Sequence, residues 1–128
     1  MLIVVSPAKT LDYETPLASS KSSQPLFKKR SAELIKVLLD YTPAQLGKLM
    51  SISDKLAELN VNRYGDWQLK ATKSNARPAL LAFQGDVYKG MDAATFKDSD
   101  FDFAQDHLAI LSGLYGVLRP LDLCSPIG

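Results

Sequence analysis

Residues 42–57 read TPAQLGKLMSISDKLA, and this stretch decides what kind of fold the chain adopts. The opening TPAQ is a strong helix start, with threonine as N-cap, proline at the first helical position and glutamine at N3. Ser53 can cap a second helix. Only the three residues 51–53 separate the two helices, and none of them is glycine or proline. The stretch therefore predicts a tight helical hairpin over about 43–64.

The rest of the chain alternates short apolar runs with helical patterns. Leu2 to Val5 is apolar without alternation and predicts a buried, central strand. Residues 12–25 are rich in Ser, Thr and Pro and predict a loop. The remaining predicted elements are a helix over 31–39, a strand over 79–83, a glycine-flanked turn or short helical piece over 85–90, a helix over 100–108 capped by Ser99, and a strand over 109–118. These elements predict a mixed α/β (α+β) fold.

Composition bounds the protein class. The chain has 128 residues, of which 46% are hydrophobic and 23% charged, so its composition is that of an ordinary globular domain. No run of eighteen apolar residues occurs, and we expect no transmembrane helix. Cys124 is the only cysteine, which excludes a disulfide framework and favours a reducing cytoplasm.

Charge is segregated along the chain although the net charge is only +1. The segment 48–77 holds six basic residues against three acids, whereas 86–106 holds six aspartates against two lysines. Such segregation can create a basic face on a neutral protein. Two solvated faces of opposite charge are an equally good interpretation.

The turn of the hairpin matches a known template. The spacing of Leu46, Leu49, the turn at 51–53 and Ala57 resembles LxxLPGVGxxxA, the helix–hairpin–helix motif of DNA-repair proteins, with serine at both glycine positions. Backbone N–H groups at the start of the second helix, together with the helix dipole, can bind a phosphate. The expected DNA contacts are Ser51, Ile52, Ser53, Lys55 and Lys48. The alternative is a plain helical hairpin in which the serine is only an N-cap.

Other residues suggest an enzyme site where strands end. Ser6 and Lys9 form an S-x-x-K pattern, but the companion motifs of serine acyl-enzymes are missing, so we keep both only as substrate contacts after a strand. Asp86 and Tyr88 follow the strand expected at 79–83, and Arg119 follows the strand expected at 109–118. Neither a nucleotide-binding glycine loop nor an EF-hand is present, and no metal site or cofactor is expected.

Several long stretches together resemble the YaaA family of bacterial peroxide-stress proteins. They are MLIVVSPAKTLDY at 1–13, ISDKLA at 52–57, FQGDVYKG at 83–90, FDFAQ at 101–105 and LSGLYGVLRPLD at 111–122. The resemblance implies a cytoplasmic protein of mixed α/β fold with a basic cleft, which limits free intracellular iron and binds double-stranded DNA through the hairpin. Family members are roughly twice this length, so residues 1–128 are expected to be either a single domain or the N-terminal half of a larger one.

The sequence thus supports two functions of different kinds. The first is a peroxide-stress protein that binds double-stranded DNA non-specifically through residues 51–55. The second is an enzyme acting on a nucleotide or nucleobase, with Ser6, Lys9, Asp86, Tyr88 and Arg119 as its candidate residues.

Overall fold

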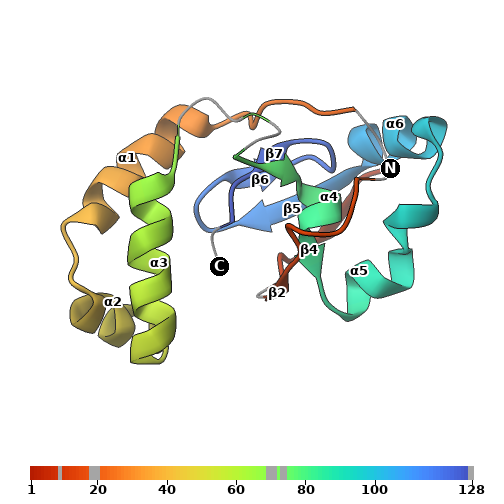
Figure 1. Ribbon diagram of the computed structural model, residues 1–128. Coiled ribbons are helices and arrows are strands. Elements are labelled where there is room, and N and C mark those ends of the chain that lie inside the picture. Colours follow the sequence, from red (N-terminus) through yellow and green to blue (C-terminus); the bar gives the residue numbers. More distant parts are fainter. Residues whose placement is uncertain (9, 18–20, 69–71, 73–74, 127–128) are drawn as a thin grey trace.

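The computed structural model describes residues 1–8, 10–17, 21–68, 72 and 75–126, and it has a mixed α+β architecture (Figure 1). Three helices form an arm on one side, a three-stranded sheet lies in the middle, and shorter helices lie on the other side. Lys9, one of the candidate substrate contacts, lies outside the described residues. Within the described part of the chain, no helix is long and apolar enough to cross a membrane.

The helical arm follows the sequence prediction. It contains α1 (Lys28–Leu39), α2 (Pro43–Met50) and α3 (Asp54–Asp66). At the start of α2 the N–H of Gln45 donates to Thr42 Oγ1 at 3.2 Å, and the N–H of Thr42 donates to Gln45 Oε1 at 3.0 Å. This reciprocal pair satisfies donors that a helix start would otherwise leave unpaired. The predicted capping box is confirmed.

The sheet has the order β1-β5-β6, and β1 is therefore an edge strand. The strand β1 (Ile3–Val5) runs parallel to β5 (Leu108–Ser112), and β6 (Gly116–Leu118) is antiparallel to β5. The prediction of a buried, central strand at 2–5 is wrong, because Leu2 is 67% and Val4 52% exposed. An apolar run signals strand formation, but it does not show whether a second strand and a covering layer flank it.

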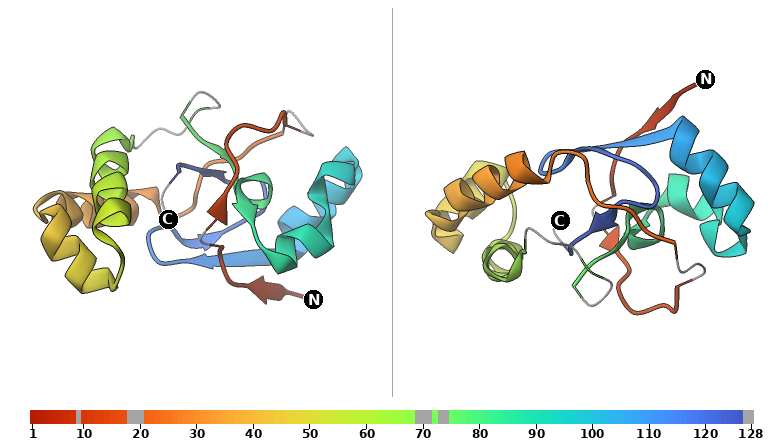
Figure 2. Two further views of the ribbon diagram at one scale, coloured as in Figure 1. Left: turned by 60° about the horizontal axis from the view of Figure 1, so that its bottom comes forward. Right: turned by 90° about the horizontal axis from the view of Figure 1, so that it is seen from above.

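Two short antiparallel pairs lie beside the sheet (Figure 2). The strand β2 (Thr10–Leu11) pairs with β4 (Phe83–Gln84), and β3 (Arg77–Pro78) pairs with β7 (Leu123–Cys124). The strand predicted over 79–83 is largely wrong, because α4 (Ala79–Ala82) is a single helical turn between β3 and β4. Its alanines and leucines are good helix formers, and a short apolar run does not distinguish a buried turn of helix from a strand.

The second helical group carries the acidic segment. It consists of α5 (Asp86–Met91), a 3-10 turn η1 (Ala93–Thr95) and α6 (Asp98–His107). The short helical piece predicted after Gly85 is confirmed. Ser99 does not cap α6 as predicted but lies inside it, because the helix begins at Asp98 and Lys97 is the N-cap residue. The Asp100 carboxylate accepts a hydrogen bond from the N–H of Lys97 at 2.9 Å, and an acid in the first turn is favoured by the helix dipole.

The strand predicted over 109–118 is a β-hairpin rather than one strand. Residues 113–115 turn the chain between β5 and β6, and Gly116 has φ 72°, a left-handed conformation that glycine adopts easily. This hairpin delivers Ile110 and Leu118 to the main core, where both are fully buried together with Phe101.

A buried carboxylate joins the end of the sheet to the N-terminal loop. Asp122 is fully buried, and its oxygens accept from the Arg119 side chain (Nη2 at 2.9 Å), from the Arg119 N–H at 2.8 Å and from Ser23 Oγ at 2.6 Å. The same guanidinium reaches the carbonyl of Gln24 at 3.0 Å. A buried charge needs such partners to offset its loss of hydration.

We therefore expect Asp122→Asn to lower the free energy of unfolding by about 2–4 kcal/mol, because hydrogen bonds to a buried charged group are lost. Urea unfolding followed by circular dichroism measures the change. The exposed Asp106→Asn is the matched control and should stay within about 0.5 kcal/mol of the wild type. Equal effects of the two substitutions would contradict the role given to Asp122.

Candidate functional site

The turn between α2 and α3 is set by a left-handed residue. Ser51 has φ 55° and ψ 46°, and the N–H of Ile52 donates to the carbonyl of Gly47 at 3.1 Å. This is the helix-ending arrangement in which glycine is usual at the left-handed position. Ser51 occupies the first glycine position of the template, so that substitution costs the backbone some strain.

The second serine replaces glycine without strain. Ser53 has φ −65° and ψ 158°, an extended conformation open to any residue. Its hydroxyl accepts a hydrogen bond from the N–H of Leu56 at 3.2 Å and caps α3 as predicted. Of the two positions where serine replaces the glycine of the template, only Ser51 is therefore unfavourable, and the hairpin keeps its shape.

The two helices pack closely behind the turn. Leu46 and Ala57 are fully buried, and a Cβ added at Gly47 would lie 3.3 Å from the carbonyl oxygen of Ile52. Glycine at 47 thus permits the close approach of the helix to the turn. Leu49 does not take part as its place in the template predicts, since it is 60% exposed.

The solvent side of the turn offers donors and positive charge. Ser51, Ser53, Lys55 and Lys48 are all exposed, and Ile52 is half-buried. The first N–H groups of a helix have no acceptor within it, and Ser53 satisfies only that of Leu56. The N–H groups of Asp54 and Lys55 are therefore available to an anion. Asp54 also places a carboxylate in this first turn, which opposes anion binding.

The enzyme candidates are brought together only in part. The Tyr88 hydroxyl donates to the carbonyl of Ser6 at 2.6 Å, so the loop after β1 lies against α5. Burial raises the pKa of Tyr88 to about 12. Asp86 is exposed at the start of α5. Arg119 follows β6, which runs antiparallel to β5, so it lies at the opposite end of the strands from Ser6. Its guanidinium is hydrogen-bonded to Asp122.

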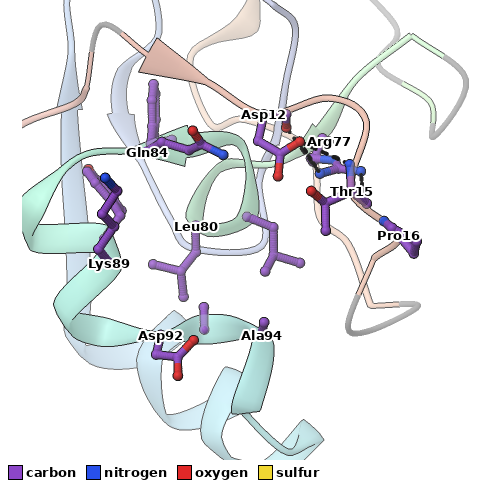
Figure 3. Close-up of a pocket in the computed structure, with 13 residues that line it drawn as sticks. Asp12, Thr15, Pro16, Arg77, Leu80, Gln84, Lys89, Asp92 and Ala94 are labelled. Atoms are coloured by element: carbon purple, nitrogen blue, oxygen red, sulfur yellow. Dashed lines mark hydrogen bonds and ion pairs between the residues drawn. The ribbon is translucent and has the colours of Figure 1, made fainter.

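A polar cluster that the sequence did not predict surrounds Arg77 (Figure 3). This arginine is buried, with its side chain 10% exposed, and it donates to the carbonyls of Asp12 (3.1 Å) and Thr15. Its Nη1 lies 3.7 Å from Asp12 Oδ1. A hydrogen bond from the Thr15 side chain, the N–H groups of Thr15 and Glu14, and the charge of Arg77 lower the pKa of Asp12 to about 2.

The cluster forms one wall of a cavity of about 240 Å³. Its apolar lining includes Leu80, Leu81 and Phe83, with Leu80 at the floor, while Gln84 and Lys89 stand at the rim. The sequence predicted only a loop over 12–25 and gave no signal for the polar wall. Arg77 gave no signal, because its partners lie more than sixty positions away.

A comparison with protein families decides the wider assignment. The family model described as peroxide stress protein YaaA matches residues 1–126. The chain belongs to this family. Both the hairpin and the Asp12 turn lie within the matched residues, so both are parts of a YaaA-family domain. Membership supports a role in the response to peroxide stress, in agreement with the resemblance noted in the sequence.

The left-handed serine gives a direct test of the YaaA hairpin geometry. We expect Ser51→Gly to raise the free energy of unfolding by about 0.5–1 kcal/mol, because glycine removes the strain of a positive φ. Chemical denaturation measures it. Ser53→Gly is the matched control and should lower stability by a few tenths of a kcal/mol, since it removes a cap at an ordinary φ. Stabilisation by both substitutions would contradict the assigned geometry.

The Asp12 turn predicts a specific loss of stability in acid. The pKa of Asp12 is lowered from its ordinary value near 4 to about 2, so its contribution is complete above pH ~4 and is lost as the pH falls towards 2. The loss amounts to about 1 kcal/mol, because solvent screens the hydrogen bonds of this exposed turn. Asp12→Asn should show a smaller loss over this range. Urea titrations at pH 5, 4, 3 and 2 measure the free energy of unfolding of both proteins. Parallel plots of this free energy against pH for the wild type and Asp12→Asn would refute the prediction.

Proposed function

We propose that this YaaA-family chain binds double-stranded DNA non-specifically through the turn between α2 and α3, in the cytoplasm, as part of the peroxide-stress response in which free intracellular iron is limited. The observation that carries the proposal is the turn itself. It combines a left-handed residue at 51, a capped helix start at 53 and free N–H groups beside Lys55.

This arrangement suits a phosphate rather than a base. Backbone N–H groups at a helix start converge on one anion, and the helix dipole adds a positive potential there. Lys55 can add a charge-assisted hydrogen bond, and the exposed Lys48 extends the positive surface onto α2. Contacts to phosphates carry no base information, so binding is expected to tolerate any duplex sequence.

The position of the turn supports access to a duplex. It lies at the outer end of the helical arm, away from the sheet and from α5 and α6 (Figure 1). The buried cluster of Ile35, Leu46, Ala57 and Tyr64 holds the arm together behind it. A rigid, protruding turn can enter a groove and approach the backbone without moving the rest of the molecule.

Asp54 limits the strength of this contact. Its carboxylate lies in the first turn of α3, where it stabilises the helix but repels a phosphate. Weak, salt-sensitive affinity is therefore expected of the hairpin alone, as for proteins that depend on a few phosphate contacts.

The lowering of free iron enters the proposal through the family's role and not through a ligand set. Among the described residues, no group of three or more His, Cys, Asp or Glu side chains is placed to hold a metal ion. A protein can protect DNA by binding to it and also by lowering the concentration of free iron, because both effects decrease the oxidative damage near the duplex.

We expect Lys55→Glu to weaken binding to random-sequence duplexes about tenfold, because a charge-assisted contact is replaced by repulsion. Fluorescence anisotropy with labelled duplexes at 50, 100 and 200 mM salt measures it. The slope of log affinity against log salt should fall by about one. The loss should be equal for different sequences.

Two further variants separate a local contact from net charge. Lys97→Glu makes the same charge change on the far side of the molecule and should weaken binding much less. Asp54→Asn removes the opposing carboxylate and should strengthen binding. If Lys97→Glu weakens binding as much as Lys55→Glu, or if Asp54→Asn has no effect, the turn is not the DNA contact.

A further inference from the structure

The cavity beside Asp12 has the features of a small-molecule site separate from the hairpin. It lies between the β2–β4 pair and the segment from α5 to η1, on the opposite side of the molecule from the α2–α3 turn. Its apolar lining includes Leu80, Leu81 and Phe83, and acceptor and donor groups occupy its walls and rim. Binding sites for small ligands combine an apolar lining with a few fixed polar groups in this way.

Asp12 is held rigidly and in its ionised form. Its N–H donates to the carbonyl of Ala82 at 2.7 Å, and its carbonyl accepts from Arg77. One carboxylate oxygen, Oδ1, accepts from the N–H groups of Glu14 and Thr15, both at 3.0 Å. Figure 3 shows the carboxylate directed towards the space above Leu80. The turn therefore orients an anionic acceptor toward the cavity.

Gln84 supplies a second polar group at the same wall. It pairs with Thr10 across the β2–β4 ladder, and its side-chain amide extends towards Asp12 at the mouth of the cavity (Figure 3). The amide nitrogen lies on the side of Asp12, so it can donate a hydrogen bond next to those that Asp12 accepts. A carboxylate acceptor beside an amide donor fits a flat ring that presents adjacent N–H donors next to a carbonyl oxygen.

We propose that this cavity binds a guanine-type nucleobase, with the N–H donors of its edge on Asp12, its carbonyl oxygen on the amide nitrogen of Gln84 and its ring face against the apolar lining at Leu80. A cavity of about 240 Å³ is too small for a drug-sized molecule but suits a single ring system. Proteins that hold unstacked bases use the same combination of edge hydrogen bonds and apolar ring contacts.

The rim fits the rest of a nucleotide. Lys89 lies on the other side of Gln84 from Asp12, where its ammonium group can reach a phosphate. Asp92 lies on the wall opposite Asp12 and can accept from a ribose hydroxyl. The positive group and the two negative groups thus lie at different sides of the cavity. This inference is independent of the DNA contact proposed for the hairpin.

Isothermal titration calorimetry of the chain with guanosine 5′-monophosphate tests the site. We expect measurable binding, with inosine 5′-monophosphate about tenfold or more weaker because it lacks the exocyclic amine. Asp12→Asn should weaken guanosine monophosphate about ten- to a hundredfold. Lys89→Ala should weaken the monophosphate but not guanosine itself. Titration with a single-stranded oligonucleotide that contains one guanine shows whether the bound base comes from a free nucleotide or from an unpaired position in a nucleic acid.

A blocking variant keeps the test independent of folding. Ala94 is exposed and lines the cavity, so Ala94→Phe should fill the mouth without disturbing the core and should abolish binding. Asp106→Asn, on α6 and outside the cavity, should leave binding unchanged. Three results would overturn the proposal. They are the absence of binding to both guanosine monophosphate and the oligonucleotide, equal affinity for guanosine and inosine monophosphate, and full binding of guanosine monophosphate by Ala94→Phe. Loss of DNA affinity in Lys55→Glu bears only on the hairpin.

Discussion

The buried guanidinium of Arg77 constrains how the N-terminal segment meets the rest of the protein. A charge with 10% of its side chain exposed must find acceptors, and here these are the carbonyls of Asp12 and Thr15. Since Arg77 lies in β3, which pairs with β7, one side chain connects the beginning, the middle and the end of the described chain. The position of the turn at 12–15 and the wall of the cavity follow from this requirement, while the lowered pKa of Asp12 comes mainly from its hydrogen bonds with Thr15 and Glu14.

The hairpin obeys a different kind of constraint, and for that reason it could be predicted. Its capping box, its N-cap at Ser53 and its tight turn each depend on residues within four or five positions of one another. Local hydrogen bonds of this kind are encoded in short sequence patterns. Even there, the sequence did not show which serine was strained, because the template has glycine at both positions and only Ser51 takes a left-handed conformation.

Features that depend on distant partners could not be predicted. The edge position of β1 depends on which strands flank it, and the helical turn at 79–82 depends on the pairs formed on either side of it. The network at Asp122 joins Ser23, Gln105 and Arg119, which are widely spaced in the sequence. The Asp12–Arg77 contact is of this type as well. The part of the candidate site that was missed is therefore the part built by tertiary contacts.

The segregated charges acquire a definite meaning in the fold. Of the basic residues between 48 and 77, Arg77 is buried and paired, so within the described residues the exposed positive charge of this segment reduces to Lys48 and Lys55, with Arg63 half-buried. The six aspartates between 86 and 106 are all exposed, on the α5–α6 side of the molecule (Figure 1). The α5–α6 side is thus acidic, whereas at the turn of the arm Lys48 and Lys55 are balanced by the exposed Asp54 and Glu58. The acidic side repels a polyanion, so the DNA contact proposed above would require the arm, and not the α5–α6 side, to face the duplex.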